Sequence, residues 1–412
     1  MNRTIGGGTG TRTGEGSGGR GSAGGANLLA LRSHNTALVL DLLRGAGAGG
    51  ISRLELAERT GLTPQAVSKI TARLRGEGLA AEAGRRASTG GKPRTVLRLV
   101  PGAGHALGVH LDRDELRAVL ADLDGTVVAE RRAPLDLGAG AETVLEGVAR
   151  AAEELAAQGL GRPVPQGAAD RPRGGALAAA PTLLGLGVAL PGPLDHVRGV
   201  LHRVTGFPEW DGYPLRDALE RRLGVPVVVD KDTNAAALGL AVGGAGSEEG
   251  GPGAGPGSFA YLHLGTGLGA GLVFGGGVHR GARTGAGEFG HQVVQLDGPP
   301  CTCGARGCIE ALCLAAVARG DLAEAARVLG AGAANLAGLL DIDQVLLGGR
   351  TVAAAPEAFV HGVGAVLDAR ARREGGHDGA VPVRLAPGGP RGVAEGAAQL
   401  LLAPLFGRGD GG

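Results

Sequence analysis

Three cysteines and one histidine are spaced in this chain as the ligands of a single metal ion would be. Cys301, Cys303 and Cys308 follow His291 closely, with glycines between them. Thiolate sulfur and imidazole nitrogen are ligands that Zn²⁺ takes in a closed tetrahedral site, and glycines let the backbone wrap around one ion. We therefore predict a Zn²⁺ site at these four residues. Cys313 lies beyond the loop and is expected to be a buried apolar residue.

No cysteine remains elsewhere for a disulfide framework, because all four lie in this one segment. A metal site in a reducing cytosol is the better explanation. The alternative is that the cysteines are small buried hydrophobic residues or an incidental redox cluster. Two carboxylates, Glu288 and Glu310, bracket the cluster. They indicate that the outer edge of the site faces a polar ligand such as a sugar.

The basic residues of this chain are unevenly distributed. The net charge of the 412 residues is only +1, yet the region from 51 to 100 holds ten Lys and Arg residues against four acidic ones. Such a local excess is typical of a surface that binds nucleic acid. No apolar run is long enough to cross a bilayer, and the glycine-rich N-terminus lacks a signal-peptide core. We expect a cytoplasmic protein that does not enter the membrane.

The elements of this basic region have clear start signals. Apolar residues between 35 and 44 predict a first helix, and Ser52 with Glu55 forms a capping box that begins a second one, from about 53 to 59. Thr63 followed by Pro64 begins a third helix, after a turn at Gly61. Two short helices separated by a tight turn, the second of them polar on its outer side, predict a helix-turn-helix.

A basic hairpin follows the third helix. Strands at 79–82 and 95–99 are expected to be joined by a glycine-tipped loop at 85–94, which is typical of a winged helix. We predict that Gln65 and Ser68 read base edges, and that the basic residues hold phosphates. The predicted contacts to double-stranded DNA are Gln65, Ser68, Lys69, Arg73, Arg85, Arg86, Lys92 and Arg94. The alternative is a three-helix packing module with an exposed basic loop.

Several motifs resemble those of the ROK family, which contains repressors and sugar kinases. The run G-E-F-G-H at 287–291 and the run C-T-C-G-A-R-G-C-I-E at 301–310 match its zinc signature, and G-G-K-P at 90–93 matches the wing of its repressors. The likeness extends from about Leu28 to about Leu405. It implies an α/β architecture with an N-terminal winged helix-turn-helix and a two-lobed actin-like ATPase (sugar-kinase-like) domain. By resemblance, Glu288, His291 and Glu310 would contact sugar hydroxyls.

The first phosphate-binding motif of the family's kinases is altered in this chain. Those kinases carry D-x-G-G-T, whereas the matching residues here are His110, Leu111, Asp112, Arg113 and Asp114. Acidic side chains in place of glycines would repel and block a nucleotide. We therefore predict that the protein does not bind ATP and is not an enzyme. The run from 264 to 271 resembles the second phosphate loop of the family.

A further motif of the family's kinases is only partly present in this chain. The run from 229 to 237 resembles N-D-x-N-A-A-A, whose aspartate is the base of the kinases, and Asp232 stands at that position. Lys231 replaces an asparagine of the motif. Its ammonium group would keep the Asp232 carboxylate charged, or would offer a cation to an acidic or phosphorylated ligand. The alternative is an ordinary capping aspartate at a strand-to-helix turn. The predicted ligand-binding residues are Lys231, Asp232, Glu288, His291 and Glu310.

The expected organisation has four parts. They are a disordered glycine-rich tail (1–26), a winged helix-turn-helix (27–101), a sensing domain (102–405) and a flexible C-terminal tail (406–412). The sensing domain is expected to have lobes at about 102–240 and 258–405, with disordered insertions at about 161–181 and 243–257. Trp210 is predicted to be a core residue.

These observations predict a transcription regulator, in the family's commoner mode a repressor, that responds to a sugar or sugar-phosphate effector. Symmetry of paired DNA half-sites predicts a homodimer or homotetramer. One alternative is an active ATP-dependent sugar kinase with a fused DNA-binding domain. Another is a regulator without a ligand, whose large domain only supplies the oligomer contact.

Overall fold

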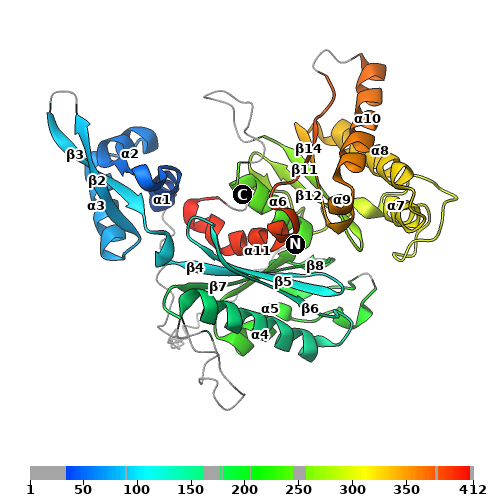
Figure 1. Ribbon diagram of the computed structural model, residues 1–412, viewed down its shortest axis with the longest axis horizontal. Coiled ribbons are helices and arrows are strands. Elements are labelled where there is room, and N and C mark those ends of the chain that lie inside the picture. Colours follow the sequence, from blue (N-terminus) through cyan, green and yellow to red (C-terminus); the bar gives the residue numbers. More distant parts are fainter. Residues whose placement is uncertain are drawn as a thin grey trace, which may run out of the picture.

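The computed structural model describes residues 34–88, 91–161, 177, 180–204, 206–244, 257–375 and 379–408. The tail predicted at 1–26 and most of the two predicted insertions lie outside this set. Within it, the chain forms an N-terminal head and two larger lobes (Figure 1). The division of the chain at 101/102 stays a prediction.

The head contains three helices and a three-stranded sheet. The helices are α1 (His34–Gly45), α2 (Arg53–Thr60) and α3 (Pro64–Gly76), and the sheet has the order β1 (Ile51–Ser52), β3 (Gly91–Leu99), β2 (Ala80–Ser88). Both predicted caps are confirmed. Ser52 and Glu55 form the capping box of α2, and the Thr63 side chain accepts the Ala66 amide at the start of α3. This is a winged helix-turn-helix.

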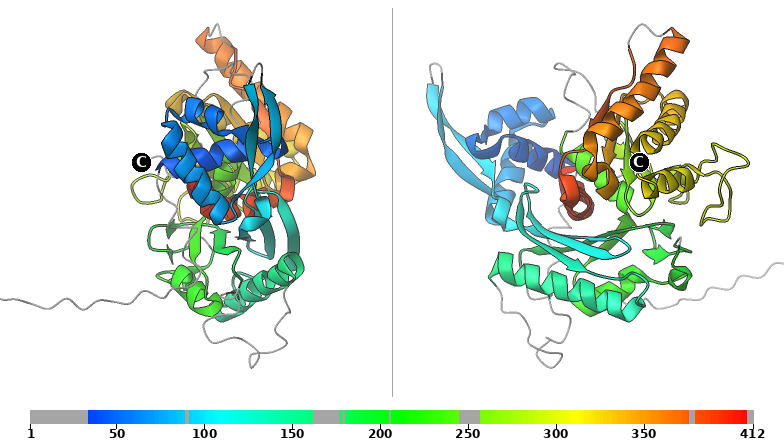
Figure 2. Two further views of the ribbon diagram at one scale, coloured as in Figure 1. Left: turned by 90° about the vertical axis from the view of Figure 1, so that its left-hand side faces the viewer. Right: turned by 45° about the vertical axis from the view of Figure 1, so that its right-hand side comes forward.

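The predicted wing loop is wrong in length. We expected residues 85–94 to be a loop, but β2 and β3 pair from Ala80 opposite Leu99 out to Ser88 opposite Gly91. The ribbon projects from the head (Figure 2). The sequence of this part of the ribbon is polar and lacks apolar alternation, so the pattern analysis did not detect its strands.

The first lobe is a mixed sheet with the order β10-β7-β4-β5-β6. Its strands are β4 (His105–Leu111), β5 (Glu115–Asp122), β6 (Val127–Pro134), β7 (Leu183–Leu190) and β10 (Val227–Lys231). Helices α4 (Ala141–Leu160) and α5 (Leu215–Leu223) cover one face of this sheet (Figure 1). Trp210 lies in the core of this lobe, 1% exposed, and its indole N–H donates to the Leu137 carbonyl at 3.0 Å.

The second lobe is a sheet with the order β13-β12-β11-β14-β15. Its strands are β11 (Phe259–Leu264), β12 (Leu268–Phe274), β13 (Gly277–Val278), β14 (Gln344–Gly348) and β15 (Val383–Leu385). The helices of this lobe are α7 (Ile309–Ala318), α8 (Leu322–Leu340), α9 (Arg350–Ala354) and α10 (Pro356–Glu374). The turn between β11 and β12 carries the glycine run that resembled a phosphate loop.

Two helices lie between the sheets, α6 (Asp232–Val242) and α11 (Gly392–Leu402). They cross where both backbones carry glycine. A methyl group at Gly396 would lie 1.9 Å from the Ala235 carbonyl oxygen, and one at Gly239 would lie 3.0 Å from the Gly396 Cα. The absence of side chains at these two positions therefore permits the close approach of α6 and α11.

The C-terminal segment joins the head to the first lobe. After α11, the short helix η8 (Ala403–Phe406) packs against α1, and Phe406 is only 3% exposed. Arg408 donates to both carboxylate oxygens of Asp41 at 3.0 Å. The flexible tail expected from residue 406 therefore begins too early, because burial of the Phe406 ring and this ion pair order the chain as far as Arg408.

In the described part of the chain, no helix combines the length and the apolar character needed to cross a bilayer.

Candidate functional site

The structure brings the five predicted ligand residues to one cleft between the two lobes. Lys231, Asp232, Glu288, His291 and Glu310 all line it. Strand β10 leads into α6 at Lys231 and Asp232, the short helix η6 (Phe289–His291) follows Glu288, and α7 carries Glu310 in its first turn. Sequence positions almost eighty residues apart thus form one polar surface.

The acidic groups of the cleft differ in how firmly they are held. Glu310 is buried, 7% exposed, and its Oε2 accepts the Leu268 amide at 2.8 Å. Among the described residues, Asp232 accepts only the Thr233 amide, at 2.7 Å, within the first turn of α6. One oxygen of Asp232 therefore remains available to accept from a ligand hydroxyl.

Lys231 is placed differently from our expectation. We predicted that its ammonium group would keep Asp232 charged, but Nζ lies 3.1 Å from Glu288 Oε1 and also donates to the Ala286 carbonyl. The side chain is 3% exposed. Burial leaves an ammonium group in need of a counter-charge, and the flanking loop supplies one in Glu288. Lys231 therefore joins the lobes beneath the cleft.

Beside the cleft, the predicted metal ligands form a cluster. One donor atom from each of His291, Cys301, Cys303 and Cys308 lies within 4.8 Å of all the others. Cys303 Sγ is 3.7 Å from Cys308 Sγ, and Cys301 Sγ is 3.7 Å from His291 Nδ1. Bonds of about 2.3 Å from one tetrahedral ion give edges of about 3.8 Å, so these donors fit Zn²⁺. Cys313 stays outside the cluster, fully buried.

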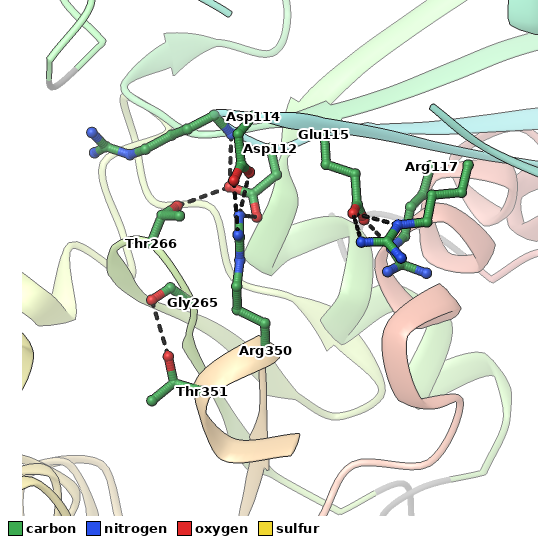
Figure 3. Close-up of polar contacts among 10 residues, drawn as sticks. Asp112, Asp114, Glu115, Arg117, Gly265, Thr266, Arg350 and Thr351 are labelled. Atoms are coloured by element: carbon green, nitrogen blue, oxygen red, sulfur yellow. Dashed lines mark hydrogen bonds and ion pairs between the residues drawn. The ribbon is translucent and has the colours of Figure 1, made fainter. Parts of the chain in front are cut away.

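Another polar cluster lies at the rim of the cleft, and sequence reasoning missed its central member, Arg350 (Figure 3). Arg350, the first residue of α9, donates to Asp112 Oδ2 at 2.6 Å and to the two oxygens of Asp114 at 2.5 and 3.0 Å. Thr266 donates to Asp112 Oδ1 at 2.9 Å. Burial alone would raise the pKa of Asp112, but hydrogen bonds from Arg350 and its neighbours lower it to about 2.

The predicted repulsion at this motif needs correction. We counted its carboxylates as free negative charges, but Arg350 neutralises much of the charge of Asp112 and Asp114. Glu115 pairs with Arg117 and Arg132 instead, and not with Arg350. The place that corresponds to the first phosphate-binding motif of the kinases is thus occupied by a cation and carboxylates that bind each other. No local pattern in the sequence pairs residue 112 with residue 350.

His110, which replaces an aspartate of the motif, is buried behind this rim. It is 6% exposed, and its Nε2 has no hydrogen-bond partner among the described residues. Its ring centroid is 6.3 Å from that of His263. Burial lowers the pKa of His110 to about 4. The imidazole is therefore neutral at physiological pH.

The predicted DNA contacts lie on α3 and the wing. Gln65, Ser68 and Lys69 are exposed on α3, and Arg85 and Arg94 are exposed on the ribbon. Arg73 is partly committed within the head, because its Nη2 donates to Thr36 Oγ1 at 2.6 Å. Arg86 and Lys92 lie on β2 and β3.

Comparison with known proteins agrees with this arrangement. The model of the ROK family matches residues 175–319, and a winged helix-turn-helix DNA-binding model matches residues 38–79. The chain carries a ROK-family domain behind a winged helix-turn-helix. The ROK match contains Asp232 and all four residues of the metal cluster.

Curated relatives match about two-thirds of the chain. The xylose repressor of Bacillus subtilis (strain 168) is 28% identical over 260 residues, which cover 63% of this chain and 61% of that protein. The DNA-binding transcriptional dual regulator NagC of Escherichia coli (strain K12) is 29% identical over 289 residues, 69% of this chain and 64% of the relative. The chain thus spans about three-fifths of the length of the curated relatives it matches.

Solved structures show the same fold. A ROK family transcriptional regulator, a homologue of the E. coli MLC protein, superposes over 91% of this chain and 97% of its own with a TM-score of 0.68, at 20% identity. The ROK hexokinase of Thermus thermophilus is 29% identical and has a TM-score of 0.52, over 71% of this chain and 96% of its own.

Proposed function

We propose that this protein is a transcription regulator of the ROK family, acting as a repressor, that releases or retains DNA according to a sugar-type effector in the interlobe cleft. The observation that carries the proposal is that one chain joins a winged helix-turn-helix to a polar cleft between two lobes, with η8 packed on α1 and α11 packed on α6 and on the sheet of the first lobe. Binding of the effector would favour one arrangement of the lobes and so change the presentation of the head.

The DNA-binding half of the proposal is supported by the surface of the head. The outer side of α3 carries Gln65, Ser68 and Lys69, and the adjoining ribbon adds Arg85 and Arg94. A helix of this kind enters the major groove, while a basic wing contacts the backbone. Because α3 alone reaches only a few base pairs, we propose that a homodimer or homotetramer binds paired half-sites.

The sensing half is supported by the chemistry of the cleft. Asp232 has an unused oxygen, and His291 directs Nδ1 toward the cysteines, which leaves Nε2 for the cleft. Carboxylates that accept hydroxyl protons and an imidazole N–H suit a sugar. When bound, Zn²⁺ would fix the loop that holds His291, and Cys301, Cys303 and Cys308 would complete its ligands.

Absence of phosphoryl transfer is supported by the Arg350 cluster. Nucleotide phosphates are bound in such folds by backbone amides that nothing else covers. Here Asp112, Asp114 and Arg350 fill the corresponding rim with their own hydrogen bonds. A nucleotide would have to break these bonds and then lie against two carboxylates.

Selection from a random pool of DNA duplexes tests the proposal at its first step. The full chain should enrich a sequence with two related half-sites, and binding should weaken steeply with salt. A screen of neutral sugars and sugar phosphates against the protein on that duplex should then find a compound that changes the fraction bound. Failure to enrich any sequence refutes the proposal. A regulator without a ligand is indicated if DNA binds and no compound acts.

An active sugar kinase remains the second candidate, because Asp232 keeps the position of the catalytic base and lines the cleft. A coupled assay for ADP across the same sugars separates the two. Turnover above about 1 per second, an ordinary enzyme rate, would establish the kinase and remove the first proposal.

A further inference from the structure

The two lobes are joined across the rim of the cleft by one guanidinium group. Arg350 belongs to the second lobe, whereas Asp112 and Asp114 lie in the turn between β4 and β5 of the first lobe. Thr266, from the turn between β11 and β12, donates to the second oxygen of Asp112. We call these four residues the rim clamp (Figure 3).

We propose that Arg350 is a positioning residue of the effector cleft: it holds the two lobes closed at the rim, so that the cleft is formed without a nucleotide. The inference rests on the proposed function for the identity of the cleft as the effector site. It adds a device that sets the shape of that cleft, made entirely from this chain's own side chains.

Hydrogen bonds fix both ends of the clamp to the rest of their lobes. The Asp112 amide donates to the Glu115 carbonyl at 2.9 Å, and the Asp114 carbonyl accepts the Leu135 amide at 3.2 Å. On the other side, the hydroxyl of Thr351 donates to the Gly265 carbonyl at 3.2 Å and ties α9 to the turn that carries Thr266. Because neither end is a free loop, making or breaking the clamp changes the distance between the lobes.

The clamp is continuous with the wall of the cleft. Asp112, Arg113 and Thr266 line the same cavity as Asp232 and His291. Arg113 stands between the two clamp carboxylates, and its guanidinium carbon is 5.5 Å from the centre of the Phe207 ring. Opening of the rim would therefore withdraw Arg113 and Thr266 from the groups proposed to bind the effector.

The solvent exposure of the side chains shows which of the two ion pairs of Arg350 contributes most to holding the rim closed. The side chains of Arg350 and Asp114 are 45% and 62% exposed, whereas that of Asp112 is 17% exposed. Water and salt weaken the pair with Asp114, so the bond between Arg350 and Asp112 carries most of the closure. The fork of the guanidinium lets one cation hold both carboxylates, which lysine cannot reproduce.

Besides the pair of Lys231 with Glu288, a buried ion pair that shares no residue with the clamp links the lobes at a deeper level. Arg280 donates to Asp230 Oδ2 at 2.7 Å, with both side chains less than 10% exposed. This buried pair and the crossing of α6 with α11 hold the lobes together at the base. Loss of the clamp should therefore loosen the rim while the protein stays folded.

Hydrogen exchange of the full-length protein with its metal tests the inference without a sugar. In Arg350→Ala, the amides of the two turns, at 111–115 and 265–268, should exchange about tenfold faster, as loss of a charged hydrogen bond implies. Arg350→Lys should give an intermediate rate. Arg327→Ala is the matched control, because it removes a two-bond pair with Glu324 inside α8. Unchanged exchange in Arg350→Ala, or an increase spread over the whole chain, would overturn the inference.

Two further measurements sharpen the result. Asp112→Asn combined with Arg350→Ala should exchange no faster than the single Arg350→Ala variant, because both remove the same bond; full additivity argues against a common clamp. AMP-PNP with Mg²⁺ should leave exchange of the wild-type turns unchanged, and slower exchange in its presence would show that a nucleotide closes the rim instead. A failed sugar screen would refute the effector proposal and leave these exchange results standing.

Discussion

Arg44 of α1 lies over the ring of Phe406, with its guanidinium carbon 4.1 Å from the ring centroid. The same arginine donates to Asp41 at 3.0 Å, and Asp41 also accepts hydrogen bonds from Arg408. The head is thus attached to the segment that follows α11 by stacking, ion pairing and burial of one aromatic ring. Any movement of α11 is expected to reach the head through these contacts.

Truncation of Phe406 should weaken this attachment. Phe406→Ala removes a ring that is 3% exposed and should destabilise the protein by about 3 kcal/mol in urea unfolding. Phe406→Leu keeps most of the buried area and should lose about 1.5 kcal/mol or less. Equal stability of the alanine variant and the wild type would show that the ring does not hold the head.

Loss of the exposed cations of the head should reduce DNA affinity in a salt-dependent way. For Lys69→Ala and Arg94→Ala we expect the slope of log affinity against log salt concentration to fall by about one unit each. Fluorescence anisotropy on the selected duplex measures this slope. Arg327→Ala, on α8, is the control and should leave it unchanged. A variant with an unaltered slope would remove its residue from the phosphate contacts.

Removal of one thiol should release the metal. In Cys303→Ser the cluster keeps only three of its donors, so metal content measured by mass spectrometry should drop well below one ion per chain, and the effector response should disappear with it. Cys313→Ser provides the control, since Cys313 Sγ bonds the Ala325 carbonyl outside the cluster. Stoichiometric metal in Cys303→Ser would show the ligand assignment to be wrong.

Acid should destabilise the protein through His110. Burial lowers the folded-state pKa of His110 from 6.5 to about 4. Between these values the unfolded chain binds a proton that the folded chain does not, so stability is full above pH 6.5 and falls as pH drops toward 4, by at most about 3 kcal/mol. In His110→Asn the pH dependence of the unfolding free energy should be flatter by about one proton. His361→Asn, on the exposed side of α10, should keep the wild-type slope.

The crossing of α6 and α11 should tolerate no side chain at Gly396. In Gly396→Ala the new methyl group would meet the Ala235 carbonyl oxygen, so we expect a loss of roughly 3 kcal/mol or more in urea unfolding. Gly364→Ala is a helical glycine with open space around it and should gain up to about 1 kcal/mol. A stable Gly396→Ala protein would mean that the helices separate easily.

The head and the residues of the cleft were predictable because their signals are local. Ser52 with Glu55 and Thr63 with Pro64 mark helix starts within four residues, and the metal ligands fall within one short segment. Strand β6 received no prediction. Strand β6 is an edge strand with charged residues at 130–132, so its apolar alternation is weak.

The contacts that join distant segments were not predictable from one sequence. Arg350 meets Asp112 only after two sheets have formed, and Lys231 finds Glu288 in preference to its neighbour Asp232. The packing of η8 on α1 likewise brings residue 406 to residue 44. Periodicity and spacing describe what lies within a few residues, whereas these pairs follow from topology.

The position of α11 late in the chain affects the order in which the protein can be assembled on the ribosome. This helix covers β4, β7 and α6, all of which are complete by residue 242, whereas α11 begins at residue 392. Their apolar surfaces therefore remain exposed until residue 402, the end of α11, has emerged from the exit tunnel. A nascent chain that stalls near residue 390 would therefore present these surfaces to chaperones, and a frameshift at that point should yield an insoluble product.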